Sequence, residues 1–275
     1  TQFLEVGSLR YLSATPLSFK GNLLFALPQS SCQMEDLEVQ LGNTIFNVGG
    51  AIVQRDSSTD FALLVNSEEG SLQDIFRLLP DSYARYLDDL ASQGDFRFAA
   101  QVEGVQNGNE YPVVSAQLEV KDHKLTSPHL VQAIEHVAFR ADYTSGQGQD
   151  SSTSQLLIQD FTAYLDQQAI QMKLHLDDFT RPQIDFHLDG TLPLGAVYGL
   201  LHRPAVSEGN GQLIIDDVQL RGALSDLVRP NRTAAAHSSG RLEFDRASLT
   251  LNHEKLSINQ GEVEFQDNQL LLKNL

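Results

Sequence analysis

The sequence is poor in the residues that build covalent and metal-bound frameworks. It has one cysteine, Cys32, and no tryptophan among 275 residues. A single cysteine excludes an internal disulfide and a zinc site made of several thiolates. Without tryptophan, a carbohydrate-binding platform would have to use tyrosine or phenylalanine.

Long apolar runs are also missing. The longest runs, 23–27 and 61–65, have five residues each, whereas a membrane-spanning helix needs about 20. The chain starts at Thr1 with no recognisable signal peptide, and strand-like alternation extends close to both ends. We therefore expect a segment of a longer protein, with any targeting or anchoring sequence outside it.

Basic residues are scarce. The 19 lysines and arginines are outnumbered by 36 aspartates and glutamates, which gives a formal net charge of -17 and a pI near 4.7. Nucleic acids and anionic lipid surfaces are bound through lysine and arginine, which neutralise phosphate charge. The composition therefore argues against nucleic acid as a partner and against electrostatic attachment to a membrane.

Catalytic signatures are missing as well. The chain contains neither His-Glu-x-x-His nor Gly-x-Ser-x-Gly, and Gly146-Gln147-Gly148 lacks the third glycine of a dinucleotide-binding loop. We therefore predict no enzymatic activity and no cofactor. Carboxylates are abundant, and a hydrolase with two of them in a cleft is a weaker alternative.

The dominant positive signal is alternation with a period of two. Near the C-terminus, pairs of apolar residues share one face: Leu242 and Phe244, Leu249 and Leu251, Leu256 and Ile258, Val263 and Phe265, Leu270 and Leu272. Polar residues occupy the other face, and short polar turns separate the pairs. The pattern recurs along the chain and predicts a mostly β fold. We expect a long curved antiparallel sheet, groove-like or folded over, with two or three short helices.

Helical spacing is confined to short segments. Residues 71–79 begin with Ser71 as an N-cap and place apolar residues on one helical face. Residues 194–201 follow Pro193, and a third candidate begins at Ser127. Strands and helices do not alternate regularly, so a parallel βαβ sheet is not expected.

A strand pair followed by a short amphipathic helix occurs twice, at about 45–91 and 168–202. The strand segments 60–63 and 185–188 match with an offset of 125 residues, and the helical segments match with an offset of 122. Such repetition is typical of sheets built from a repeated module. We expect a single elongated β domain over 1–275 that contains these two pseudo-repeats.

Two stretches carry a resemblance to a known family. Residues 158–190, IQDFTAYLDQQAIQMKLHLDDFTRPQIDFHLDG, followed by LPLGAV at 192–197, resemble the AsmA-like proteins of Gram-negative envelopes. The recurrent phrase of that family is an apolar strand, Asn/Asp-Phe, a turn with proline, an Ile-x-Leu-x-Leu-x-Gly strand and a leucine-containing helix. Residues 78–80, followed by 94–98, Gly104 and Pro112, resemble the large AsmA-like chains of Bacteroidetes. The resemblance covers about 45–275.

The resemblance implies a location and a role. AsmA-like proteins have an inner-membrane anchor, a periplasmic body and a long curved β-sheet whose apolar groove is proposed to guide lipid toward the outer membrane. The family has no active site to transfer. For this chain the resemblance implies a periplasmic C-terminal segment, lipid acyl chains and envelope proteins as partners, and membrane contact only through an anchor outside the segment.

The candidate lipid contacts are apolar residues that alternation places on one face. They are Phe96, Phe98, Ile170, Met172, Leu174, Leu176, Ile184, Phe186 and Leu188. Three short helices cannot cover more than ten strands, so part of this face would stay open for acyl chains. The alternative is that these side chains form the ordinary core between the sheet and its covering elements. A sheet folded over on itself would satisfy both interpretations.

Two histidines suggest a metal-binding patch. His175 and His187 both face away from the apolar side, and a hairpin that pairs them would also set Asp177 opposite Asp185. Imidazole nitrogen and carboxylate oxygen are ligands that Zn²⁺ accepts. The more favoured interpretation is an ordinary solvated face of an acidic sheet, because alternation alone produces such patches.

Taken together, these features favour a non-enzymatic lipid-binding segment involved in outer-membrane biogenesis. The acyl chains would be held by transfer of apolar surface out of water. The alternative is a β-sandwich carbohydrate-binding or adhesion module that uses tyrosine and aspartate on an exposed face.

Overall fold

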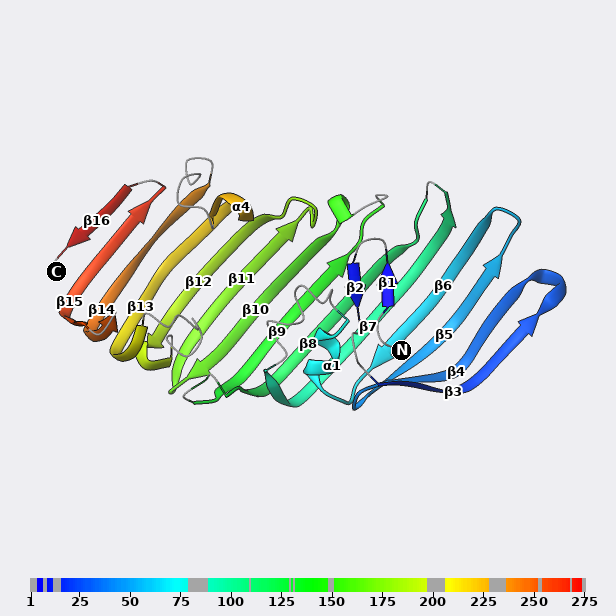
Figure 1. Cartoon of the computed structure of the whole chain (residues 1–275), viewed down its shortest axis with the longest axis horizontal. Helices are drawn as coiled ribbons and strands as arrows, with labels where there is room; N and C mark the ends of the chain where they lie inside the picture. Colours follow the sequence, from blue (N-terminus) through cyan, green and yellow to red (C-terminus); the bar gives the residue numbers. More distant parts are fainter. Residues whose placement is uncertain are drawn as a thin grey trace. The chain divides into compact units, whose positions relative to one another are not determined.

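The computed structural model describes most of the chain. The described residues are 4–6, 9–11, 16–78, 89–108, 110–128, 130, 132–147, 151–196, 206–227, 236–251, 254–267 and 269–273. Most of them lie in β-strands, and each strand of the main sheet lies beside its neighbours in sequence (Figure 1).

The strands form a two-stranded sheet and a 14-stranded antiparallel sheet. The small sheet contains β1 (Leu4–Val6) and β2 (Leu9–Tyr11). The large sheet contains β3 (Leu17–Ala26), β4 (Ser31–Leu41), β5 (Thr44–Gln54), β6 (Ser58–Ser67), β7 (Ala91–Asn107), β8 (Val113–Thr126), β9 (Ile134–Thr144), β10 (Gln155–Leu165), β11 (Gln168–Asp177), β12 (Gln183–Pro193), β13 (Val206–Ala223), β14 (His237–Leu251), β15 (Glu254–Gln266) and β16 (Gln269–Lys273). The strand order is the sequence order, with β3 and β16 at the two edges. The predicted mostly β, antiparallel fold is confirmed.

Short helical segments interrupt the strands. Ser71 caps helix α1 (Leu72–Phe76) as predicted, because its side-chain oxygen accepts the N–H of Gln73. Residues 194–196 are helical, and the rest of that predicted helix lies outside the described residues. Helix α4 (Leu224–Leu227) and the 3₁₀ turns η1 (Leu27–Gln29) and η2 (Ser151–Thr153) were not predicted.

The helix predicted to begin at Ser127 is wrong. Ser127 and Pro128 lie in a turn after β8, and Ile134 is the first residue of β9. Only three apolar residues supported that prediction, and an isolated helix this short is unstable without a tertiary partner. The residues that follow therefore form strand β9 instead of continuing a helix.

Residue contacts group the chain into two compact units where we expected one elongated domain. Unit 1 contains Thr1–His123 and Ala141–Gln155, and unit 2 contains Lys124–Arg140 and Leu156–Leu275. Each pseudo-repeat falls within one unit: β5, β6 and α1 in unit 1, and β11, β12 and the helical residues 194–196 in unit 2. Residues 79–88 and 197–202 of these repeats lie outside the described residues.

The core of unit 1 gathers where α1 meets the sheet. Leu72 and Ile75 of α1 are buried, and Phe46 of β5 meets Phe98 of β7 edge to face at 5.7 Å. The N–H of Leu72 donates to the hydroxyl of Ser92 at the start of β7. In unit 2, the buried apolar residues include Val137, Ala163, Leu165, Ile215 and Val218.

A β-bulge in unit 2 sets the position of the polar site described below. Asp217 in β13 has a left-handed φ of 49°, and the pairing with β14 shifts between Asp216 and Gln219. Gly240 of β14 faces the bulge with a φ of 142°, and a Cβ there would lie 2.7 Å from the Cα of Val218. The close approach requires glycine at position 240.

The described helices are all short. None of them is long and apolar enough to cross a membrane.

Candidate functional site

The apolar face of unit 2 is built from rows of side chains that run across the strands. One row joins Ile170, Gly190, Ile215, Leu242, Val263 and Leu272 from β11 to β16. A second row joins Met172, Leu188 and Val218, and continues past Gly240 to Phe265 and Leu270. We call these residues, together with Leu174, Leu176, Ile184, Phe186 and Leu220, the unit 2 apolar face.

All seven predicted lipid contacts of β11 and β12 lie on this face. Ile170, Met172, Leu174, Leu176, Ile184, Phe186 and Leu188 are all half-buried. Ile215 and Val218, which lie in the same rows on β13, are buried, and Leu270 and Leu272 at the β16 edge are exposed. The face is therefore neither a closed core nor fully solvated, and its accessibility increases toward the sheet edge.

The two remaining predicted contacts belong to a different environment. Phe96 and Phe98 of β7 are only 5% and 8% exposed, and both lie in unit 1. Phe98 packs edge-on against Phe46. These two rings are buried core residues of unit 1, as in the alternative interpretation of an ordinary core.

Unit 1 has an apolar face of its own that the sequence analysis did not single out. Phe25, Cys32, Ile52, Phe61 and Gly104 form one cross-strand row from β3 to β7, and Leu23, Met34, Gly50, Leu63 and Val102 form another. The alternation of apolar and polar residues in β3 and β6 could have indicated this face from the sequence. Cys32 is half-buried in this face.

On the polar face of unit 2, the hairpin register differs from the predicted one. His175 pairs with Asp185, and His187 pairs with Lys173 rather than with His175. The turn is shorter than expected because the Asp178 carboxylate accepts the N–H groups of Thr180 and Arg181. The hydroxyl of Thr180 is the main cause of the lowered pKa of Asp178.

His187 lies between two carboxylates. Its Nε2 is 2.8 Å from Oδ2 of Asp189 on the same strand and 2.9 Å from Oδ1 of Asp217 in the β13 bulge. The backbone N–H of Asp217 donates to Oδ1 of Asp189 at 2.8 Å, which ties the bulge to β12. Asp217 was missed because a bulge in the middle of a strand leaves no distinct signal in the alternation.

The four residues of the predicted metal patch do not converge. The Asp185 carboxylate accepts hydrogen bonds from Nη2 and Nε of Arg221 at 2.6 and 3.0 Å. Nε2 of His175 lies 3.3 Å from the Asp177 carboxylate. His187 faces Asp189 and Asp217 instead. Within the described ranges, no group of three or more His, Cys, Asp or Glu side chains is placed to hold a metal ion.

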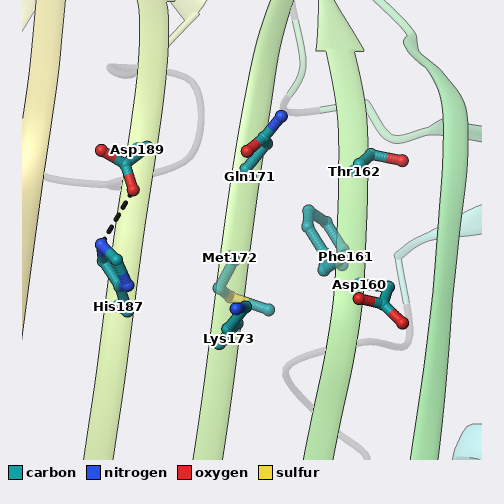
Figure 2. Close-up of a pocket in the computed structure, with 8 residues that line it drawn as sticks. All are labelled: Asp160, Phe161, Thr162, Gln171, Met172, Lys173, His187 and Asp189. Atoms are coloured by element: carbon teal, nitrogen blue, oxygen red, sulfur yellow. Dashed lines mark ion pairs between the residues drawn. The ribbon is translucent and has the colours of Figure 1, made fainter.

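A hollow of about 370 Å³ lies beside His187 and is contained within unit 2. Figure 2 shows its lining on three segments: Asp160, Phe161 and Thr162 of β10, Gln171, Met172 and Lys173 of β11, and His187 and Asp189 of β12. Most of these side chains donate or accept hydrogen bonds. The hollow therefore combines hydrogen-bonding groups with the apolar side chains of Phe161 and Met172.

Further along the polar face, charges alternate in sign. Arg241 of β14 pairs with Asp216, and the hydrogen bond between them is the main cause of the raised pKa of Arg241. Lys273 of β16 lies 2.5 Å from Glu264 and 3.5 Å from Glu262, and its hydrogen bond lowers the pKa of Glu264. These exposed pairs are typical of a solvated sheet face.

Comparison with protein-family models, curated proteins and solved structures finds no match to this chain.

Proposed function

We propose that this chain is a non-enzymatic, lipid-binding segment whose unit 2 apolar face holds acyl chains. One observation carries the proposal: rows of aliphatic and aromatic side chains continue across β11 to β16, and the seven residues in β11 and β12 are only half-buried. Continuous apolar surface that stays accessible marks an interaction site in a soluble protein.

The energetics of this surface favour a flexible hydrocarbon ligand. Each buried methylene contributes about 0.8 kcal/mol, so about ten methylenes would contribute about 8 kcal/mol before the cost of association. The rows contain no charged side chain. A hydrocarbon chain needs no hydrogen-bond partner, so this composition suits it.

The cellular setting of the proposal rests on the resemblance in the sequence. An AsmA-like segment would act in the periplasm during outer-membrane biogenesis, anchored in the inner membrane by another part of the protein. The open antiparallel sheet agrees with the fold that this resemblance implies.

Native mass spectrometry of protein purified from cells provides the first test. We expect adducts with the masses of phospholipids or fatty acids. Binding of a fluorescent fatty acid then locates the site. Leu174→Glu places a charge on the unit 2 apolar face and should weaken binding at least tenfold.

The matched control is Gln171→Glu, which adds the same charge three residues away on the opposite face of the same strand. It should bind the fluorescent fatty acid as the unaltered protein does. A protein that carries no lipid and does not bind the probe contradicts the proposal. Equal losses in both variants would argue against the apolar face as the site.

Carbohydrate binding is the second candidate, and the polar hollow beside His187 supports it. Its carboxylates, amide and hydroxyl are the groups that recognise sugar hydroxyls, and Phe161 adds a ring to the lining. A glycan array tests this candidate. A signal that is lost in Asp189→Asn but kept in Leu174→Glu would favour it over lipid binding.

A further inference from the structure

Edge strand β3 exposes large apolar side chains on both of its faces. Leu17, Phe19, Leu23, Leu24 and Phe25 are between 40% and 71% exposed. Leu23 and Phe25 lie on the apolar side of the sheet, whereas Leu24 lies on the other side. β4 is the only strand paired with β3 among the described strands. Such an edge is a template for another strand.

The opposite edge has the same character. Leu270, Leu271 and Leu272 of β16 are between 53% and 64% exposed. Leu270 and Leu272 end the two rows of the unit 2 apolar face, and Leu271 lies on the other side. Within the described part of the chain, β16 pairs only with β15.

The backbone of β3 points outward at the residues that another strand would use. The N–H of Gln54 donates to the carbonyl of Ser30 at 2.8 Å, so the next residue, Ser31, directs its backbone groups toward Ala26 of β3. Hydrogen-bonding direction alternates along a strand. The N–H and C=O groups of Leu23 and Phe25 therefore face away from β4.

The same argument holds for β16. The N–H of Asp267 donates to the carbonyl of Ser238 in β14, so Gln266 directs its backbone groups toward Gln269 of β16. Leu270 and Leu272 therefore present their N–H and C=O groups away from β15.

We propose that copies of this chain associate head to tail, with β16 of one copy adding to β3 of the next. In this register Leu270, Leu271 and Leu272 lie opposite Phe25, Leu24 and Leu23. The proposed pairing is antiparallel, like the pairing between neighbouring strands of the large sheet. The five residues of β16 match the five residues of β3 that follow its irregularity between Lys20 and Asn22.

The pairing brings apolar side chains together on both sides of the new ladder. Leu271 meets Leu24 on one side, while Leu270 and Leu272 meet Phe25 and Leu23 on the other. The contact is heterologous, because it uses two different surfaces, and each added copy exposes a new β3 or β16. This inference does not depend on lipid binding.

Single-edge variants test the arrangement. Leu23→Pro removes an outward N–H from β3, and Leu272→Pro removes one from β16; proline is tolerated at such edge positions. By analytical ultracentrifugation, the unaltered protein should associate with rising concentration. Each variant alone should remain at the monomer mass of 30.4 kDa.

Mixing the two variants is the decisive step. Each keeps the edge that the other lacks, so an equimolar mixture should form a species of twice the monomer mass and stop there. A monomeric unaltered protein overturns the proposal. So does dimerisation of the Leu272→Pro variant alone, which would indicate β3 pairing with β3 about a two-fold axis. Association that neither variant reduces would place the contact away from the edges.

Circular dichroism verifies that the variants fold. If a proline variant loses its strand signal, Leu24→Lys and Leu271→Lys replace the pair, since they place charges in the same ladder without removing an N–H. The same pattern is expected: each lysine variant alone should stay monomeric, and their equimolar mixture should form a dimer, because the intact β16 of the Leu24→Lys variant can pair with the intact β3 of the Leu271→Lys variant. Association of either lysine variant with itself would contradict the proposed register.

Discussion

The two units share one pattern of alternation but bury it differently. In unit 1, α1 packs on the sheet, and Phe96, Phe98 and the Asp74 carboxylate are all buried. In unit 2, the apolar residues of β11 and β12 are half-buried, and the Asp185 carboxylate pairs with Arg221 at the surface. Alternation therefore specifies which face a residue occupies, whereas the elements packed on that face decide whether the residue becomes core or an open surface.

The largest expected contrast comes from removing one aromatic ring in each unit. Phe98→Ala should destabilise the protein by about 3–5 kcal/mol, because it opens a cavity beside Phe46. Phe186→Ala removes a half-buried ring from the unit 2 apolar face and should cost less than about 2 kcal/mol. Denaturant unfolding followed by circular dichroism measures both. Equal losses would show that the two faces are equally closed.

Removing one carboxylate from each unit should give the next largest difference in stability. The Asp74 carboxylate is 2% exposed and accepts the N–H of Asn43, the Thr44 hydroxyl and Nη1 of Arg77. Asp74→Ala leaves these donors unpaired and should cost about 3 kcal/mol. Asp185→Ala breaks an exposed pair with Arg221 in unit 2 and should cost less than about 1 kcal/mol.

The same unfolding experiment measures the two aspartate variants. Asp74→Asn is the matched control, since it keeps an acceptor oxygen and should recover part of the loss. If Asp185→Ala proves as costly as Asp74→Ala, the polar face of unit 2 is less solvated than its exposure indicates.

Glycine-to-alanine substitutions should differ in their effect on stability between a position where backbone lies close and a position with open space around it. Gly240→Ala in unit 2 would place a Cβ 2.7 Å from the Val218 backbone at a φ of 142° and should cost about 2 kcal/mol. Gly49→Ala in unit 1 meets nothing within 4 Å. It should be neutral or stabilise by up to about 1 kcal/mol. Melting temperatures are sufficient to rank the two variants.

The smallest contrast concerns pH. His123 in unit 1 is 1% exposed, and burial lowers its pKa from 6.5, although Asp95 and Asp122 oppose the shift. The unfolded chain therefore takes up the proton first as pH falls below 6.5. Stability should be complete above that pH and decrease below it. Thermal unfolding of the unaltered protein and of His123→Gln at pH 7.5 and 5.5 tests this expectation. The melting temperature of the variant should fall less between the two pH values than that of the unaltered protein.

Much of the architecture could be predicted because its cause is local. Alternation placed Met172, Leu174, Phe186 and Leu188 on one face, and the cap at Ser71 placed α1. The antiparallel arrangement also followed, since short polar turns favour hairpins between neighbouring strands. These features depend on residues that are close together in the chain.

What could not be predicted depends on distant or irregular contacts. The burial of Phe98 depends on Phe46, 52 positions earlier. The register at His187 depends on hydrogen bonds inside the Asp178 turn, and the proximity of Asp217 depends on a bulge. Composition specifies none of these contacts, so the predicted metal patch placed the right residues on the right face but in the wrong pairs.

The strand order has a consequence for how such a chain folds and diversifies. Every strand of the large sheet pairs with its immediate sequence neighbours, so most of its pairings close short loops and cost little chain entropy. Any hairpin is a place from which pairing can spread in both directions, as in repeat proteins. Gain or loss of one whole hairpin preserves the direction and the facing of every other strand. The sheet can therefore change in size over evolution without a change in design.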